Sequence, residues 1–184
     1  MEKSWQSVYS ARTAEASENL KLRCDDEIKS GIEERCESEI EKLLLVEMAF
    51  SRLWGQPPNT VSDPTFPWSE WGQLDYPANG VAIIPQAEIG AYRVDFLLVV
   101  GTFDGVLRLV VVECDGHDFH ERTKAQAQHD KKRDRDLQKL GLPVLRFTGS
   151  EVWRDAKKCV ADITAHIRAS VDSARAERQR TRDE

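Results

Sequence analysis

Two acidic side chains at the end of an apolar run are the feature of this sequence most able to do chemistry. The run 109–112 leads into Glu113, Cys114 and Asp115. Because successive side chains of a strand point to opposite faces, Glu113 and Asp115 should share one face while Cys114 points the other way. Two carboxylates at the end of a buried strand repel each other and lose hydration, so they need a cation or a proton.

A third acid, Asp95, lies within a second strand-like run, residues 92–100. Asp104 and Gly105 stand between this run and the run 106–114, and Asp-Gly is a strong hairpin-turn signal. The two runs are therefore predicted to be antiparallel neighbours, which brings Asp95 close to Glu113. Carboxylate oxygens on two adjacent strands predict a divalent-metal site.

The elements that must position these acids follow from hydrophobic periodicity and turn residues. The pattern predicts helices over about 25–53, 120–140 and 150–169, and strands over 81–85, 92–100, 106–114 and 143–148. Ser38 could cap a helix start, because Glu41 follows at the capping-box spacing. The order helix, three strands, helix, strand, helix predicts an α/β fold with a mixed central sheet flanked by helices.

With 184 residues, the chain is expected to form one domain with extensions. We predict a helical extension over 1–37, a domain over 38–170 with a long loop rich in Pro and Trp at 55–80, and a polar tail over 171–184. We find no apolar run of membrane-spanning length, and the segment Met1 to Ser17 lacks the apolar core of a signal peptide. A cytoplasmic protein with no membrane partner is expected, and its four cysteines are expected to be free thiols.

The charge is unevenly distributed. A net charge of −6 argues against a protein that coats nucleic acid through its overall potential. Basic residues nevertheless cluster just after the acidic strand: Arg122, Lys124, Lys131, Lys132, Arg133, Arg135 and Lys139. The cluster is compatible with a confined phosphate-binding surface and equally with a solvated helix face.

Several motifs together resemble the PD-(D/E)XK nuclease superfamily, and within it the small DUF559 and very short patch repair endonuclease type. The segment Tyr92–Phe96 resembles the "RPDF" strand, with Val94 in place of proline, and Val112–Gly116 resembles the "IEVDG" strand. The "D..R...L...G..VLR" pattern is matched by Asp130, Arg133, Leu137, Gly141, Val144, Leu145 and Arg146. The helix start Ser38–Leu43 resembles "SPIE.LL", and His120 lies four residues after Gly116, as in the repair endonucleases.

This resemblance implies a restriction-endonuclease-like core and metal-dependent hydrolysis of phosphodiester bonds in DNA. It implies that Asp95 and Glu113 bind Mg²⁺, for which Mn²⁺ could substitute, and that the Cys114 carbonyl is a third ligand. Glu41 would hold a metal-bound water or a second ion, although a capping-box acid needs no catalytic role. A homodimer is compatible with this family.

The sequence departs from the superfamily at one catalytic position. The superfamily usually has a lysine two residues after the second acid, and this chain has Asp115 there. His120, His117 and Lys131 are the candidates to replace that lysine, and we favour His120 because an imidazole titrates near neutral pH. Asp115 would bind a second metal or orient that histidine.

The residues expected to contact nucleic acid are Arg93, His117, Lys124, Lys132, Arg133 and Arg135. Two other classes of function remain open from the sequence. The missing lysine would also suit a catalytically inactive nucleic-acid-binding or regulatory module on the same fold. An acidic helix near the N-terminus would suit a subunit that docks onto a protein partner.

Overall fold

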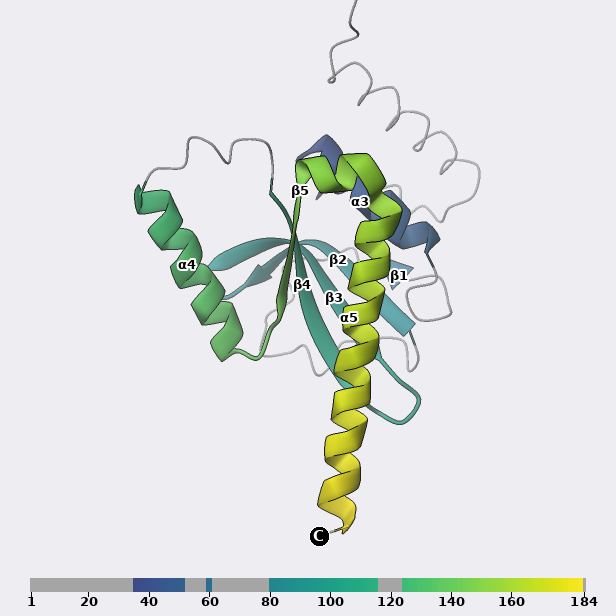
Figure 1. Ribbon diagram of the computed structural model, residues 1–184. Helices are drawn as coiled ribbons and strands as arrows, with labels where there is room; N and C mark the ends of the chain where they lie inside the picture. Colours follow the sequence, from purple (N-terminus) through teal and green to yellow (C-terminus); the bar gives the residue numbers. More distant parts are fainter. Residues whose placement is uncertain (1–34, 52–58, 61–79, 116–123, 184) are drawn as a thin grey trace, which may run out of the picture.

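The computed structural model describes residues 35–51, 59–60, 80–115 and 124–183 (Figure 1). Its elements are α3 (Glu39–Phe50), β1 (Asn59–Thr60), β2 (Gly80–Ile89), β3 (Tyr92–Gly101), β4 (Leu107–Asp115), α4 (Lys124–Lys139), β5 (Val144–Thr148) and α5 (Gly149–Asp183). The strands form one sheet in the order β1-β2-β3-β4-β5. The β1–β2 and β4–β5 pairs are parallel, whereas β2–β3 and β3–β4 are antiparallel. The predicted mixed α/β sheet is confirmed, with β1 as an added short edge strand.

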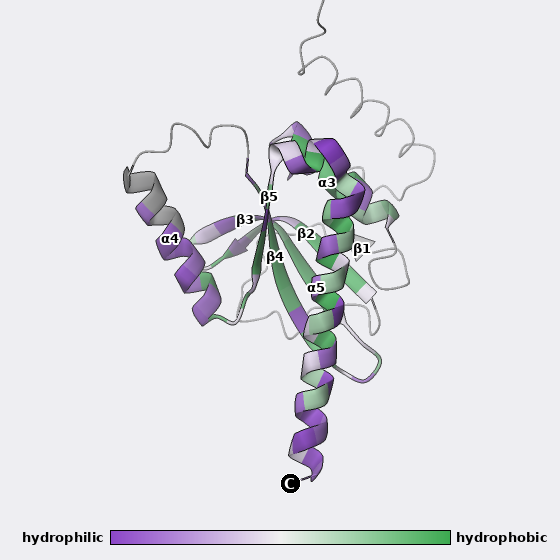
Figure 2. Ribbon diagram, viewed as in Figure 1, coloured by the Kyte–Doolittle hydropathy of each residue, from purple (hydrophilic) through white to green (hydrophobic). Residues whose placement is uncertain are grey.

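Helices cover both faces of this sheet. Helix α4 lies on one face, and α3 and α5 lie on the other (Figure 1). The larger buried cluster joins α3 and α5 to the sheet and includes Leu44, Phe96 and Ile163, while the smaller one includes Leu97 and Leu137 on the α4 side. Figure 2 shows apolar strands between helices whose outer surfaces are polar. Because Phe96 and Leu97 alternate between the two clusters, each strand contributes to both cores.

The β3–β4 hairpin forms as predicted. Gly105 has a φ of 74°, a left-handed conformation that glycine adopts without steric cost. The Gly105 N–H donates to the Thr102 carbonyl at 2.8 Å, and the Thr102 N–H donates to the Val106 carbonyl at 3.1 Å. The turn sets the register in which Phe96 pairs with Val112, so the next positions toward the open end of the hairpin are Asp95 and Glu113.

Helix α3 begins as its capping signal predicts. Ser38 is the N-cap residue, with extended backbone angles, and its side chain accepts a hydrogen bond from the Glu41 N–H at 3.2 Å. This bond satisfies one of the N–H groups left unpaired at a helix start. The cap fixes the position of Glu41 in the first turn of α3, and Glu41 is part of the site described below.

The expected end of the last helix near Ala169 is wrong, because α5 continues to Asp183. Val171 and Ala174 are buried against the sheet, so the apolar face of the helix extends further than its polar composition suggests. Arg175 then binds Asp104 in the β3–β4 turn, with its Nε 2.7 Å from Oδ2. Tertiary contacts hold the segment in the helix that its sequence alone would leave frayed.

The predicted domain limits, including the loop at 55–80, stay predictions, and residues 1–34, 52–58 and 61–79 lie outside the described part of the chain. Among the described helices, we find none with the length and apolar character needed to cross a membrane.

Candidate active site

The predicted acids meet at the open end of the β3–β4 hairpin. Asp95 stands one position beyond the Phe96–Val112 pair, and its Oδ2 accepts the backbone N–H of Cys114 at 2.6 Å. This hydrogen bond ties the carboxylate of one strand to the backbone of the other, next to Glu113. The predicted approach of Asp95 to the acidic end of β4 is confirmed.

Glu113 forms an ion pair with Arg133 of helix α4. Its side chain is buried, with 4% of the residue exposed, and its Oε1 accepts a hydrogen bond from Arg133 Nη2. A buried carboxylate needs such a partner, because removal from water costs several kcal/mol, on the order of the attraction that the ion pair returns. The Arg133 Nε is also buried, and it has no hydrogen-bond partner among the residues that the structure describes.

Asp115 has a second arginine as its neighbour. Arg146 on β5 donates from Nη1 to Asp115 Oδ1 at 3.4 Å and from Nη2 to Asp134 Oδ1 on α4 at 2.5 Å. Glu113 and Asp115 therefore both meet arginines on the α4 side, whereas Cys114 packs against the cluster on the α3 and α5 side. The predicted alternation of these three side chains is confirmed.

Glu41 reaches the same region from α3. It is buried, with 6% exposed, and its carboxylate accepts hydrogen bonds from Ser38 Oγ at 2.7 Å, the Glu37 N–H at 2.9 Å and Gln86 Nε2 at 2.8 Å. Gln86 has a φ of 52° and lies between the pairs Pro85–Phe96 and Ala87–Val94, level with Asp95. Glu41 thus stabilises the helix start and also adds negative charge beside Asp95.

The environment of Asp95 disfavours its charged form. Burial raises the pKa of Asp95 from 3.8 to about 6, and the negative charges of Glu41 and Asp115 act in the same direction. The Cys114 N–H and the positive charge of Arg133 lower the pKa, without cancelling the effect of burial. Among the described side chains, the site holds four carboxylates and two guanidinium groups: Glu41, Asp95, Glu113 and Asp115 with Arg133 and Arg146.

This shifted pKa predicts how stability depends on pH. Because the pKa of Asp95 is about 6 in the folded protein and lower in the unfolded chain, the stability present below about pH 4 is lost as pH rises through 6. Asp95→Asn should therefore raise the free energy of unfolding at pH 8 by up to about 3 kcal/mol. Urea unfolding in EDTA at pH 8 and pH 4.5 would measure this, and equal effects at both pH values would contradict it.

Asp95 and Glu113 carry carboxylate oxygens, which are the ligands that Mg²⁺ and Mn²⁺ prefer. Among residues 35–51, 59–60, 80–115 and 124–183, however, no group of three or more His, Cys, Asp or Glu side chains is placed to hold a metal ion. Arg133 contributes the positive charge beside Glu113 in this arrangement.

The remaining predicted site residues fall into two groups. His117 and His120, and the side chain of Lys124, lie outside the described residues. Lys131, Lys132 and Arg135 are exposed on α4, and Arg93 is exposed and paired with Glu37, with 2.6 Å between Nη2 and Oε1. Unlike these cations, Arg133 points toward the acidic side chains and pairs with Glu113. From the sequence it was expected among the nucleic-acid contacts.

Three residues of the site were not singled out for it by sequence: Arg146, Asp134 and Gln86. Arg146 stands between apolar residues of β5, and a charge inside a strand that pairs on a buried sheet is a signal of a buried partner. Asp134 directly follows Arg133 on a helix rich in charge, so it could not be distinguished from its neighbours. The left-handed backbone of Gln86 has no sequence signal.

Comparison of the sequence with known protein families identifies the family of this chain. No curated protein and no solved structure matches the chain. The family model REase_MTES_1575, which describes a restriction endonuclease-like family, matches residues 76–167 and so includes Asp95, Glu113, Asp115, Arg133 and Arg146. The match covers half of the 184 residues and is consistent with the predicted PD-(D/E)XK fold, and the chain therefore belongs to this restriction endonuclease-like family.

Proposed function

We propose that the protein is a divalent-metal-dependent endonuclease that hydrolyses phosphodiester bonds of DNA. The observation that carries the proposal is the meeting of Asp95 with the Glu113 end of β4, held by the hydrogen bond from the Cys114 N–H at 2.6 Å. Family membership supports a nuclease, and the position of the acids supports the metal-dependent kind.

In this proposal Asp95, Glu113 and the Cys114 carbonyl would hold Mg²⁺ or Mn²⁺, with Glu41 near a metal-bound water or a second ion. A bound divalent ion supplies polarisation of the phosphoryl oxygen and acidification of a coordinated water. Arg133 carries a positive charge beside Glu113, where it can face the negative charge that develops on a phosphate. Because a guanidinium does not give up its proton near neutral pH, we assign the general base to His120 and the orientation of that histidine, or a second metal, to Asp115.

A cleavage panel tests the proposal directly. The purified protein would be incubated with duplex, single-stranded, nicked and mismatched DNA in Mg²⁺, Mn²⁺ or EDTA, and products would be resolved on denaturing gels. We expect internal cleavage that requires a divalent ion. Absence of cleavage from every substrate, or equal cleavage in EDTA, would contradict the proposal.

The arrangement of Arg133 also favours a second candidate function, an inactive nucleic-acid-binding module. Arg133 pairs with Glu113, and no group of acids in the described ranges is arranged around a metal position. Calorimetry with Mn²⁺ separates the two candidates, because an inactive module need not bind metal at Asp95 and Glu113. Binding that is lost in Glu113→Gln would support the enzyme.

The exposed cations of α4 give a separate prediction about DNA affinity. Lys132 and Arg135 are exposed on α4, and we propose that both contact backbone phosphates. Changing both to Gln should weaken duplex binding and reduce the slope of log affinity against log salt by about 2. Fluorescence anisotropy in EDTA measures both quantities. An unchanged slope would assign these residues to a solvated helix face.

A further inference from the structure

A second group of arginines lies at the other end of the sheet, where α5 crosses the β3–β4 turn. Arg178 donates from Nη1 to the Asp104 carbonyl and from Nη2 to the Gly105 carbonyl, both at 2.9 Å. Arg175 binds the Asp104 carboxylate. These contacts fix the last turns of α5 over the hairpin and hold Arg178 in place.

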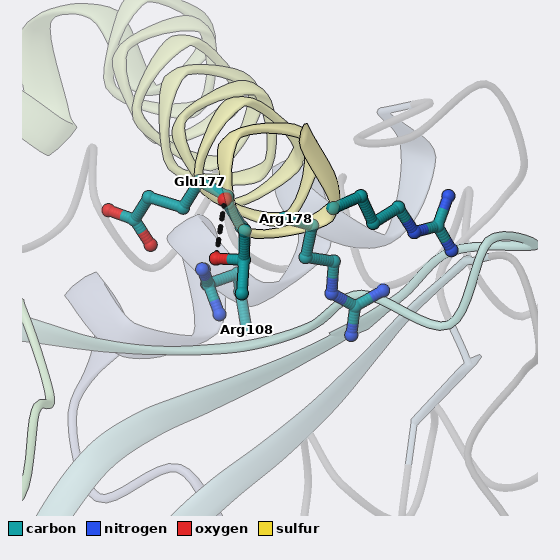
Figure 3. Close-up of a pocket in the computed structure, with 6 residues that line it drawn as sticks. Arg108, Glu177 and Arg178 are labelled. Atoms are coloured by element: carbon teal, nitrogen blue, oxygen red, sulfur yellow. Dashed lines mark hydrogen bonds between the residues drawn. The ribbon is translucent and has the colours of Figure 1, made fainter. Parts of the chain in front are cut away.

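A cavity of about 460 Å³ opens beside these contacts, and we call it the arginine groove. Its lining residues are Arg108, Ala174, Glu177, Arg178, Thr181 and Arg182 (Figure 3). Figure 3 shows Glu177 extending away from Arg178. A smaller cavity of about 230 Å³ shares Arg178 and Arg182 with the groove.

The arginines of the groove keep most of their charge available. Arg108 donates from Nε to the Ser170 carbonyl at 3.3 Å and from Nη1 to the Leu107 carbonyl at 2.9 Å. Backbone carbonyls orient a guanidinium without neutralising it, so the three arginines and one glutamate of the lining have a net charge of +2. The negative end of the α5 dipole offsets only about half a charge. This surface is therefore positive in a chain whose net charge is −6.

An exposed aromatic side chain stands next to the same turn. Phe103 is 85% exposed and precedes Asp104, which Arg175 and Arg178 bind. Proteins that bind unpaired nucleic acid combine a positively charged groove with aromatic side chains on which bases stack. An acidic peptide would also meet the positive charge, but an exposed ring in the turn that Arg178 binds favours a nucleic-acid strand.

We propose that the arginine groove binds the phosphodiester backbone of a nucleic-acid strand, with Phe103 stacking on a base. The inference rests on the proposed function for its choice of ligand, since it assigns a second contact to the same class of substrate. Arg108 lies five residues before Glu113 on β4, about 17 Å away at the rise of a strand. The groove is lined by α5, on the sheet face opposite α4. A single nucleic-acid strand therefore reaches both the groove and Glu113 only if it is long.

Binding of a fluorescent single-stranded 30-nucleotide DNA in EDTA tests the groove without requiring cleavage. Arg178→Gln with Arg182→Gln should weaken binding about tenfold and reduce the log–log salt slope by about 1.4. Arg182→Gln alone, which keeps the turn contacts of Arg178, should reduce the slope by about half as much. The matched control is Arg154→Gln with Arg168→Gln, two exposed residues of α5 outside the groove, which should bind within twofold of the unchanged protein.

Phe103→Ala separates a strand-binding groove from a general electrostatic surface. It should weaken single-stranded binding about fivefold or more and leave duplex binding within twofold. Equal losses in the groove and control variants, or an unchanged salt slope in folded Arg182→Gln, would overturn the inference. So would poly-glutamate binding that needs Arg178 and Arg182 while DNA binding does not. Absence of cleavage from every DNA substrate contradicts the proposed enzyme and leaves these binding results intact, so the two failures are distinguishable.

Discussion

Asp95→Asn and Glu113→Gln should each lower the rate of divalent-dependent DNA cleavage by about a thousandfold. Each replacement keeps the size of the side chain and removes one of the two carboxylates assigned to the metal. The expected loss is large because a metal and its ligands supply several kcal/mol of stabilisation that is needed only in the transition state. Initial rates of plasmid nicking in Mg²⁺ and in Mn²⁺ measure the effect.

Two controls separate a chemical effect from a structural one. Asp162→Asn removes a carboxylate that is exposed on α5 and paired with Lys158, and it should cleave at the unchanged rate. Unfolding in EDTA should show that Asp95→Asn is folded and, at pH 8, at least as stable as the unchanged protein, since the replaced carboxylate has a pKa of about 6. Full activity in both site variants would exclude Asp95 and Glu113 from catalysis.

The parts of the site that could be predicted depend on local sequence rules. The Asp104–Gly105 turn determined that β3 and β4 are antiparallel, and strand alternation put Glu113 and Asp115 on one face. Ser38 and Glu41 mark the start of α3 at the capping-box spacing. Each rule acts over a few residues, so it can be applied to the sequence without any knowledge of tertiary contacts.

The parts that could not be predicted depend on contacts between distant segments. The basic helix was expected to present Arg133 outward, yet the rotation of α4 about its axis turns it toward Glu113 while Lys132 stays exposed. Strand β2 was expected to end at Pro85 and continues to Ile89, because Ala87 is buried and Glu88 pairs in register with Arg93. Helix α5 was expected to end near Ala169, and contacts with the hairpin turn extend it.

Ion pairs between segments that are distant in the sequence set the charge of the site. Glu113 pairs with Arg133, Asp115 and Asp134 pair with Arg146, and the positive charge of Arg133 also acts on Asp95. Burial lowers the pKa of Arg133, and the neighbouring positive charge of Arg146 lowers it further. Arg133 is therefore a costly group to bury, and its ion pair with Glu113 and the negative charges of Asp95 and Asp134 offset that cost. A divalent ion bound at Glu113 would supply the positive charge that Arg133 now supplies.

This relation predicts the second large effect. Arg133→Met should lower the free energy of unfolding in EDTA by about 3 kcal/mol, because Glu113 is then buried without its partner. Added Mn²⁺ should restore much of that stability, since a cation at Asp95 and Glu113 takes over the lost positive charge. Urea unfolding with and without Mn²⁺ measures both changes.

Two comparisons identify Glu113 as the cause. Arg135→Met, two residues away and exposed, should change stability by less than about 0.5 kcal/mol and should gain no Mn²⁺ response. Adding Glu113→Gln to Arg133→Met should recover stability in EDTA, because residue 113 then carries no buried charge, and should remove the rescue by Mn²⁺. If Arg133→Met is as stable as the unchanged protein, or if Mn²⁺ stabilises the double variant as strongly as the single one, then Arg133 and the metal do not share Glu113. In the second of these cases the carboxylate would serve the ion pair alone, which is the behaviour expected of the inactive module.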